Sequence, residues 1–467
     1  MFSKTAKILI TLVIKNSQLK LPEQFLNSLN GIKGFDEKAF ENLHNGEEKI
    51  TSIRLNPFKK VELDFKTDKP VNWSENSFYL NERPSFTFDP LFHAGCYYVQ
   101  EAGSVFLEHA LKNSVDLTQE ISVLDLCAAP GGKSTLINSL INEKSFLISN
   151  EVIKPRAEVL IHNLNKWGTC NTAVTNCDPQ VFSKLDSVFD VIVADVPCSG
   201  SGLFRKQPDA VNEWSLDNVN LCSTRQKRIV ADCLPSLKPG GIFIYSTCSY
   251  SKEENEMEVE WMMREFDLEL VNIPLEESWN IIDTGLGYRF YPYFTKSEGF
   301  FCCVLKKKGE AEINHGKKNK KINFEEIGKK EFEPLKDKIT LKENHKIFRF
   351  QNDFKLVNAA LFDFMNHYGT SVYFKKTGTT LGELKHQDFL PHHELAQSIY
   401  LSSSVNKIEL SKEQAISFLK KENLNVKAER GICLMTYKNY GLGWVKVLDN
   451  RTNNYLPKEF RILSQEE

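Results

Sequence analysis

The spacing of apolar residues along the chain changes from a helical period to a strand period. Near the N-terminus, Phe25 with Leu29 and Phe40 with Leu43 repeat at helical spacing on either side of a G-I-K-G turn, which predicts two packed helices. From residue 123 onward, short apolar runs alternate with longer amphipathic segments, as in a parallel α/β sheet. Strands are predicted over 123–126, 146–149, 172–175, 191–194 and 242–245.

Further along, the pattern predicts the elements that flank and close this sheet. A helix over 221–237 is expected to end at the K-P-G-G sequence of 238–241, a proline–glycine stop. Another helix is predicted over 253–266. Aromatic residues alternate over 287–307, which predicts a closing antiparallel hairpin. The apolar C-terminal part ends in an alternating stretch with turn glycines at 441 and 443, as in the strands of a small barrel.

Together these elements predict the fold class: an α/β protein with a doubly wound, mostly parallel, Rossmann-like sheet. A small α+β domain is expected before the sheet, and an α+β or β-barrel region after it. Changes in composition divide the chain into 1–83, 84–308, a lysine-rich linker at 309–346 that contains K-K-N-K-K, and 347–467. The apolar run at 8–14 is shorter than the roughly 20 residues of a membrane span, so a short leader or element is expected there.

Composition and charge narrow the class of protein further. Of the 467 residues, 41% are hydrophobic and 26% are charged, which indicates a soluble globular chain of several domains. The formal net charge is −2, so contact with a polyanion requires a local positive patch. The 11 cysteines form no C-x-x-C pair and accompany no histidine cluster. This predicts no metal site, and reduced thiols in the cytoplasm.

The stretch S-V-L-D-L-C-A-A-P-G-G-K-S-T at 122–135 predicts a buried strand, a small-residue turn and a helix start. Its small residues allow close approach of a ligand, and the helix N-terminus favours an anionic group. A P-loop would need glycine where Cys127 stands, and the G-x-G-x-x-G dinucleotide pattern is incomplete. The remaining ligand is a smaller nucleoside with one carboxylate, which S-adenosylmethionine fits. A plain strand–turn–helix corner is the alternative. The candidate binding residues are Cys127, Ala128, Ala129, Pro130, Gly131, Gly132 and Lys133.

Acidic residues follow the next two predicted strands, where open α/β sheets bind ligands. Glu151 lies about 20 residues past the glycine turn, a usual place for a carboxylate that binds both ribose hydroxyls. It could instead be an acid in the first turn of a helix. Asp178 follows the third strand and could accept a hydrogen bond from an adenine amino group.

Two cysteines occupy similar turns after the last two predicted strands, in D-V-P-C-S-G-S-G at 195–202 and Y-S-T-C-S-Y at 245–250. A thiolate suits attack on an electron-poor ring carbon. Addition at C6 of cytosine would activate C5 to take a methyl group from a sulfonium cofactor, with Asp195 bonding N3 and the amino group. Simple packing of buried cysteines is the alternative. The spacing leaves open whether Cys198 or Cys248 attacks.

Several longer motifs of the chain are shared with one known family. They are Y-Y-V-Q-E-A-G-S, D-L-C-A-A-P-G-G-K-S-T, N-E-V, D-V-P-C-S-G-S-G-L-F-R-K-Q-P-D-A, K-P-G-G-I-F-I-Y-S-T-C-S-Y-S-K-E-E-N-E, S-E-G-F-F, G-L-G-W-V-K and N-N-Y-L-P-K-E. The chain resembles the Sun-type RNA (cytosine-5) methyltransferases, most of all the bacterial members that act on 16S ribosomal RNA and carry a PUA-like C-terminal extension. The resemblance runs from Leu21 onward, loosely over 350–411. It implies that Cys248 attacks and Cys198 assists product release.

The same resemblance implies how S-adenosylmethionine is held. Residues 127–133 would wrap its methionine part, Glu151 its ribose and Asp178 its adenine side. Asp195 would lie between the methyl group and the base.

The resemblance also implies RNA as the partner, either ribosomal RNA or the small ribosomal subunit, for a monomer with no membrane contact. Transfer RNA, less readily DNA, and a non-catalytic ribosome-assembly role are the alternatives. Both terminal domains, 1–83 and 347–467, would then bind RNA. In the first, Arg54 and Asn56 are candidate RNA contacts or parts of a capped turn. In the second, basic and aromatic residues suited to RNA are Lys446, Arg451, Lys458, Arg461, Trp444 and Tyr455.

Overall fold

The computed structural model describes residues 21–44, 46, 50–309, 324–386, 388–424, 426, 428–449 and 451–464, so the leader expected at 1–20 lies outside the described residues. The N-terminal helical pair is confirmed as α2 (Glu23–Leu29) and α3 (Glu37–His44). Phe25 is fully buried, and its ring lies 5.1 Å from the rings of both Phe204 and Trp214. The pair therefore packs on the segment 84–308. A three-stranded antiparallel sheet follows, formed by β1 (Thr51–Leu55), β2 (Ser77–Leu80) and β3 (Tyr97–Val99).

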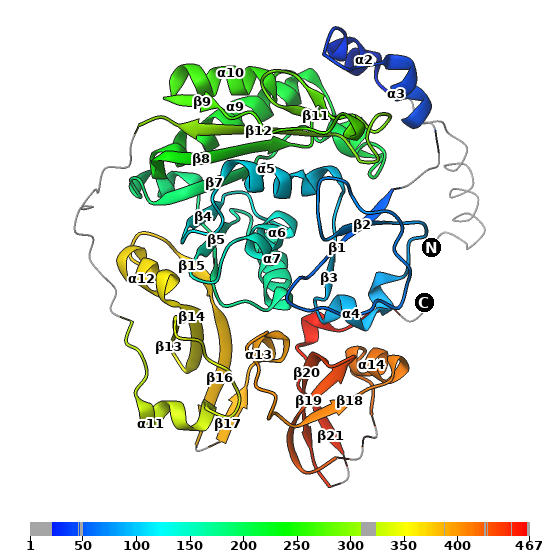
Figure 1. Ribbon diagram of the computed structural model, residues 1–467. Coiled ribbons are helices and arrows are strands. Elements are labelled where there is room, and N and C mark those ends of the chain that lie inside the picture. The colour runs from blue at the N-terminus through cyan, green and yellow to red at the C-terminus, as the bar shows by residue number, and fades with distance from the viewer. Residues whose placement is uncertain are drawn as a thin grey trace, which may run out of the picture.

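A ten-stranded sheet forms the centre of the molecule, and five of its strands run parallel in the order β6-β5-β4-β7-β8 (Figure 1). All the predicted strands are present, and the doubly wound fold is confirmed. The bounds are β4 (Ser122–Asp125), β5 (Phe146–Asn150), β6 (Thr172–Thr175), β7 (Phe189–Asp195) and β8 (Leu237–Thr247).

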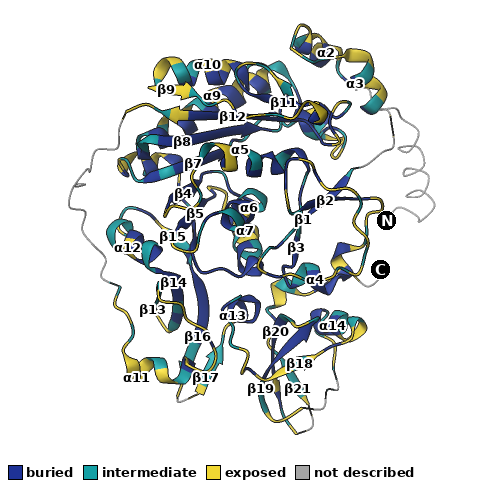
Figure 2. Cartoon of the chain, in the orientation of Figure 1, coloured by how far each residue is buried: buried dark blue, intermediate teal, exposed yellow. Residues whose placement is uncertain are grey.

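Helices cover both faces of this sheet, and the strands between them are almost wholly buried (Figure 2). On one face, apolar side chains of α5 (Phe106–Ser114) and α6 (Gly132–Leu140) pack against the strands. On the other face, α9 (Leu216–Cys233) and α10 (Glu256–Glu265) do the same. Shorter or more peripheral helices are α4 (Pro90–His93), α7 (Lys154–Trp167) and α8 (Ala210–Glu213).

One side of the sheet is antiparallel, as the alternating aromatic residues predict. The expected hairpin is formed by β11 (Tyr288–Phe290) and β12 (Phe300–Lys307), and β12 lies antiparallel to β8. Two short strands, β9 (Leu268–Leu270) and β10 (Ile282–Asp283), pair with this hairpin.

The predicted helix stop at 238–241 is wrong, because these residues lie inside β8. The preceding helix α9 already ends at Cys233, before Pro235, which cannot donate a helical hydrogen bond. Leu237 then pairs with Phe189 and Ile242 pairs with Val191, so the K-P-G-G residues form a bulge between two paired positions. Gly240 takes a φ of +76° there, which glycine adopts without steric cost.

The chain after 323 forms two further sheets and also completes the central one. The middle sheet contains β13 (His345–Phe350), β14 (Asp353–Asn358), β16 (Thr379–Lys385) and β17 (Asp388–Pro391), with α12 (Ala359–Tyr368) beside it. Between them, β15 (Phe374–Thr377) pairs antiparallel with β6 and so extends the central sheet. In contrast to the linker expected over 309–346, the described part of that segment is folded: it forms α11 (Lys329–Phe332) and fully buries Leu335.

The last sheet contains β18 (Lys407–Glu409), β19 (Gly431–Tyr437), β20 (Tyr440–Val447) and β21 (Thr452–Asn454), next to α13 (His393–Gln397) and α14 (Lys412–Leu419). The prediction that Gly441 and Gly443 form the turn is wrong. The turn is made by Lys438 and Asn439, with φ of +48° and +69°, and both glycines lie in β20. A Cβ on Gly441 would lie 1.9 Å from the carbonyl oxygen of Ala396, so close approach of α13 explains this glycine.

Candidate active site

The small-residue turn after β4 is held from behind by α7. Gly131 caps α6 with a φ of +110°, and its amide donates to the Ala128 carbonyl at 2.8 Å. Two side chains of α7 donate to the next carbonyls along the turn: Arg156 to Ala129 and Asn163 to Pro130, both at 2.8 Å. The turn therefore keeps a fixed shape with the helix N-terminus beside it, as a ligand loop requires.

This turn forms one wall of a cleft of about 340 Å³. The opposite walls come from the loop before α5, from the ends of β7 and β8, and from the loop before β12. The volume is in the range of pockets that bind small ligands, roughly 300–1,000 Å³. Of the sequence-predicted site residues, the cleft is lined by Cys127, Ala128, Ala129, Pro130, Gly132, Lys133, Asp195 and Cys248.

Lys133 and Asp195 form an ion pair inside this cleft. The ammonium lies 2.8 Å from the Asp195 carboxylate, whose other oxygen accepts a hydrogen bond from the Ser246 hydroxyl at 2.7 Å. Burial alone would lower the pKa of Lys133, but the charges of Asp195, Asp125 and Cys248 outweigh burial and raise it. A permanently charged lysine therefore fixes the Asp195 carboxylate beside the cysteines.

The two cysteine sulfurs lie 3.0 Å apart, although 50 residues separate them in the chain. Cys248 lines the cleft, whereas Cys198 is absent from its lining. The hydrogen bond with Cys248, together with burial, raises the pKa of the Cys198 thiol well above its usual range. Cys198 is thus held as a thiol behind the sulfur that faces the cleft.

A buried carboxylate that sequence reasoning missed connects the two cysteine turns. Glu254 accepts hydrogen bonds from the amide and hydroxyl of Ser199, at 2.7 and 2.6 Å, and from the hydroxyl of Ser249 at 2.5 Å. These serines directly follow Cys198 and Cys248. Burial raises the pKa of Glu254, although its hydrogen bonds oppose that rise. Glu254 could have been found from the sequence, because it lies in the S-K-E-E-N-E end of a motif that the chain shares with the family named above.

Glycines allow the backbones of these turns to cross at close range. The Gly202 amide donates to the Cys248 carbonyl at 2.8 Å, and a Cβ on Gly202 would lie 2.5 Å from the Gly299 carbonyl oxygen. Any larger side chain at Gly202 would push the two strand ends apart. The crossing thus fixes the loop that carries Cys248 against the loop that carries Cys198.

The structure places Glu151 and Asp178 away from the cleft lining. Glu151 is buried, accepts a hydrogen bond from the Ile153 amide at 2.8 Å and lies 3.6 Å from Arg156. Asp178 lies after β6 at the carboxyl edge of the sheet and forms a half-exposed ion pair with Arg228 at 3.2 Å. Their expected roles toward ribose and adenine stay predictions.

Arg54 and Asn56 are buried, so their interpretation as RNA contacts is wrong. The Arg54 guanidinium stacks on Trp167 and donates to Gln100, Thr135 and the Gly132 carbonyl, so it supports the ligand turn from within the protein. Burial lowers its pKa to about 9. Asn56 donates to the carbonyls of Gly95 and Trp167.

Trp444 is likewise buried, at 3% exposure, and its indole donates to the His392 carbonyl. Among the aromatic candidates of the last sheet, Tyr455 is exposed, as are the basic residues Lys446, Arg451, Lys458 and Arg461.

The chemistry of the turn fits a nucleoside ligand with polar hydrogens. Asp125, at the end of β4, is fully buried, and one of its oxygens accepts a hydrogen bond from Ser134 at 2.6 Å. Its other oxygen has no hydrogen-bond partner in the described part of the chain. Burial raises the pKa of Asp125 to about 7. An unpartnered acceptor of this kind suits a ligand donor.

The described ranges contain neither a metal site nor a membrane-spanning helix. They contain no group of three or more His, Cys, Asp or Glu side chains that could hold a metal ion. No helix in this part of the chain has both the length and the apolar character needed to cross a bilayer.

A doubly wound sheet with a small-residue turn, a nucleoside-sized cleft and a carboxylate at the end of the fourth parallel strand defines the class: an S-adenosylmethionine-dependent methyltransferase. The solved structures agree. A methyltransferase homolog from Pyrococcus horikoshii superimposes with a TM-score of 0.53 at 27% identity, over 66% of this chain and 100% of that one. NSun6 from the same organism, solved with SFG, shares the fold at 18% identity with a TM-score of 0.53, over 62% and 99% of the two chains.

The family is shown by sequence. Family models match residues 21–102 as the N-terminal domain of 16S rRNA methyltransferase RsmF, 113–306 as 16S rRNA methyltransferase RsmB/F and 405–462 as the RsmF PUA domain. Ribosomal RNA small subunit methyltransferase F of Shewanella woodyi is 31% identical over 87% of this chain and 90% of that protein. The Vibrio cholerae protein of the same name is 29% identical over 94% and 98%. The chain belongs to this RsmF family of 16S rRNA methyltransferases.

Proposed function

We propose that this enzyme transfers a methyl group from S-adenosylmethionine to C5 of a cytidine in 16S ribosomal RNA, through a covalent bond between Cys248 and C6 of the base. One observation carries the proposal: the Cys248 sulfur lines the same cleft as the ligand turn and lies 3.0 Å from a second cysteine sulfur. A methyltransferase that acts on oxygen or on an amino nitrogen has no need of paired thiols.

The residues at the cleft have separate roles in the proposed reaction. The Cys248 thiolate adds to C6 of cytosine, and the electrons of the C5–C6 bond make C5 nucleophilic. S-Adenosylmethionine, bound by the 127–133 turn, supplies the electrophilic methyl group. Asp195, held by Lys133, accepts a hydrogen bond from the cytosine amino group and so fixes the orientation of the ring. C5 would displace the methyl group from the sulfonium sulfur, leaving S-adenosylhomocysteine, and the C5 proton would then pass to water. The electrons of that C–H bond re-form the C5–C6 double bond and expel the Cys248 sulfur, and the Cys198 thiol assists release of the product by donating a hydrogen bond to that sulfur.

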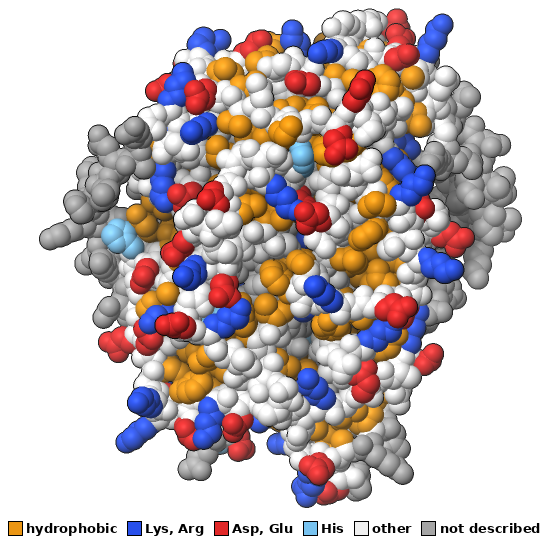
Figure 3. All heavy atoms as spheres, viewed as in Figure 1, with side chains coloured by type: hydrophobic (Ala, Val, Ile, Leu, Met, Phe, Trp, Pro, Cys, Tyr) orange, Lys and Arg blue, Asp and Glu red, His pale blue; other side chains and the backbone are white. Residues whose placement is uncertain are grey.

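Two acidic residues outside the cleft lining belong to the same proposal. Glu151 and Asp178 would contact the ribose and the adenine side of the cofactor. Charges of both signs are interspersed over the face of the molecule shown in Figure 3, in keeping with the net charge of −2, so RNA binding depends on local surfaces of the N-terminal and C-terminal domains. The target base must be flipped out for the sulfur to reach C6 from above the ring. The enzyme would act as a monomer in the cytoplasm.

The test is methylation with labelled cofactor of 16S rRNA and of small subunits from a strain that lacks the gene. Digestion to nucleosides should place the label in 5-methylcytidine, and bisulfite sequencing should identify one protected position. Label in transfer RNA alone would support the tRNA alternative. Binding of RNA and cofactor without any transfer would support the assembly-factor alternative. Label on another base, or on an exocyclic nitrogen, would refute the proposal.

A further inference from the structure

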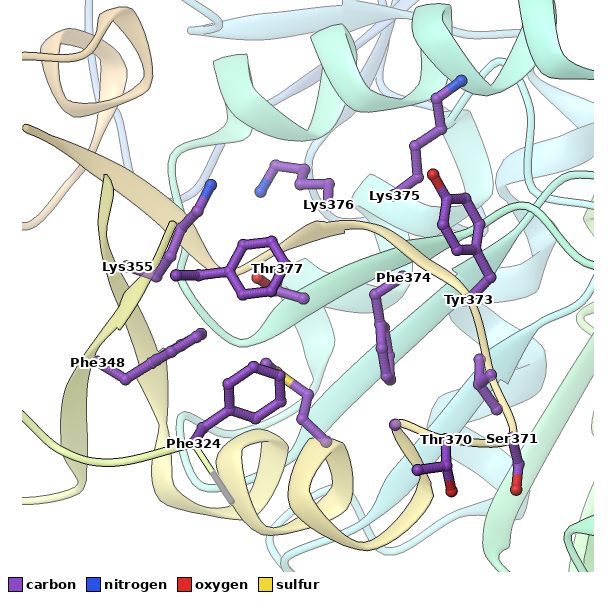
Figure 4. A pocket seen from close by; sticks show the side chains of 14 residues that line it. Phe324, Phe348, Lys355, Thr370, Ser371, Tyr373, Phe374, Lys375, Lys376 and Thr377 are labelled. Atoms are coloured by element: carbon purple, nitrogen blue, oxygen red, sulfur yellow. The ribbon is translucent and has the colours of Figure 1, made fainter. Parts of the chain in front are cut away.

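A second cavity, of about 400 Å³, lies where the middle sheet meets the catalytic sheet. The chain leaves the catalytic sheet at the end of β15, passes Gly378 and continues as β16 in the middle sheet (Figure 1). The cavity lies in the angle between the two sheets, with α12 along one side (Figure 4). The proposed methyl transfer makes no use of it.

Aromatic side chains form the walls and the rim of this cavity. Figure 4 shows Phe324, Phe348 and Phe374 around a shared space, and the rings of Phe324 and Phe348 lie 5.1 Å apart. At the rim, Phe350 is 47% exposed and Tyr373 is 66% exposed. Single exposed apolar side chains are common, but exposed ones that gather beside a cavity mark a candidate binding site. Two exposed rings beside an aromatic cavity offer stacking faces for a flat ligand.

The charge of the cavity is positive. Its described lining contains three lysines and no carboxylate. Lys375 and Lys376 form ion pairs with Glu158 and Glu394. Lys355 instead donates to the Thr380 hydroxyl at 2.6 Å and forms no ion pair with a carboxylate of the described residues. The charge of Lys355 also acts on Glu394, but no direct ion pair joins the two, so the ammonium keeps hydrogen-bond donors for an anionic ligand.

The cavity also adjoins the edge of the sheet that carries the active site. The Tyr373 carbonyl accepts a hydrogen bond from the amide of Asn176, which directly follows β6 at the carboxyl edge. A polyanion that enters the methyl-transfer cleft along this edge would meet the cavity.

We propose that this cavity binds an unpaired base of the RNA substrate, stacked on Tyr373 and Phe350, with Lys355 on a neighbouring phosphate. A flat ring together with an anion is the ligand that exposed aromatic side chains and a lysine without a direct ion pair recognise. Stacking tolerates any base, so the cavity grips single-stranded RNA near the target and does not read its sequence. This inference rests on the proposed function, because it assumes an RNA substrate.

Kinetics of rim variants test the proposal with the full-length enzyme and 16S rRNA. Tyr373→Ala and Phe350→Ala should each raise the KM for RNA about 5- to 100-fold, the range measured for loss of base stacking. They should leave kcat and the KM for S-adenosylmethionine unchanged, and Tyr373→Phe should behave as wild type. Lys355→Gln should weaken RNA binding and lower its salt dependence. Met257→Ala, on α10, is the matched control, because this apolar residue is 47% exposed, like Phe350, and lies outside the cavity and both terminal domains.

Photo-crosslinking gives an independent measurement. RNA containing 4-thiouridine, irradiated on the wild-type enzyme, should yield a crosslinked peptide that contains Tyr373 or Phe350. Unchanged KM in the Tyr373→Ala/Phe350→Ala double variant, or crosslinks elsewhere only, would overturn the cavity proposal. Failure of the proposed function is distinguishable, because the wild-type enzyme would then form no 5-methylcytidine.

Discussion

The two cysteine turns resemble each other in sequence and position, but they differ in their surroundings. Each cysteine follows a parallel strand, β7 or β8, and each is followed by a serine that bonds to Glu254. Yet only Cys248 lines the cleft, together with Lys133 and Asp195. Cys198 lies against the Cys248 sulfur, and its pKa is raised by that contact and by burial. The two turns are similar in sequence, but their surroundings give only Cys248 access to the cleft and raise the pKa of Cys198.

In the proposed mechanism, attack and release need different environments for the same side chain. A nucleophile must reach the ligand, and the cleft supplies that access to Cys248. A group that assists release must keep its proton until the product forms, and the raised pKa of Cys198 provides this property. The shared carboxylate Glu254 keeps both at a fixed distance. Four measurements test this difference between Cys248 and Cys198.

The largest effect is expected for Cys248→Ala. Without the attacking sulfur, C5 of cytosine is not activated, so methylation should fall by about 10⁴-fold or more. Labelled-cofactor transfer to 16S rRNA measures the loss, and binding of S-adenosylmethionine should be unchanged. Cys433→Ala, a buried thiol of β19, serves as the control and should keep full activity. If Cys198→Ala lost as much methylation activity as Cys248→Ala and differed from it in no other way, the two cysteines would not have different roles.

Cys198→Ala should instead leave the first step intact and slow the last one. The Cys248 adduct should accumulate as a protein–RNA complex that survives denaturing electrophoresis, while turnover falls by about 10²- to 10⁴-fold, the range for loss of an acid–base group. The double variant with Cys248→Ala should form no complex. A complex formed by Cys248→Ala alone would reverse the assignment of the two cysteines.

Glu254→Gln should affect both turns to a similar extent. The amide keeps one acceptor oxygen and places an N–H₂ group where two serine hydroxyls now donate. We expect about a tenfold loss in kcat and a loss of about 1–3 kcal/mol in the free energy of unfolding, measured by urea denaturation. The exposed Glu260→Gln, on the helix α10 that follows Glu254, is the control. Unchanged activity would show that the two turns hold their positions without this carboxylate.

The smallest effect concerns thiol reactivity as a function of pH. Alkylation requires the thiolate, so the raised pKa of Cys198 should delay its labelling to a pH above the ordinary thiol value of 9.0, while Cys248, which lines the cleft, is labelled first. In Cys248→Ala the hydrogen bond that raises the pKa of Cys198 is lost, so labelling of Cys198 should begin at a lower pH than in the wild type. Mass spectrometry of iodoacetamide-treated protein measures both. No shift between wild type and variant would contradict the coupling.

The parallel strands, the ligand turn and the cysteines after two strands could all be predicted from the amino-acid sequence alone. These features depend on residues a few positions apart, where apolar spacing and small-residue turns indicate local structure directly. The same local signals misplaced the end of α9 at 238–241 and the turn at Gly441, because glycine serves bulges and close approaches as well as turns.

Three features became visible only in the folded structure. Cys248 lines the cleft, Arg54 is buried, and β15 pairs with β6 in the central sheet. The contacts responsible join distant positions: Cys198 and Cys248 are 50 residues apart, and Ser199 and Glu254 are 55 apart. The pairing of β15 with β6 spans an even longer stretch of chain. Local spacing specifies which segments become strands and helices, but it carries no information on which of them meet, because packing and burial are settled between segments only when the chain folds.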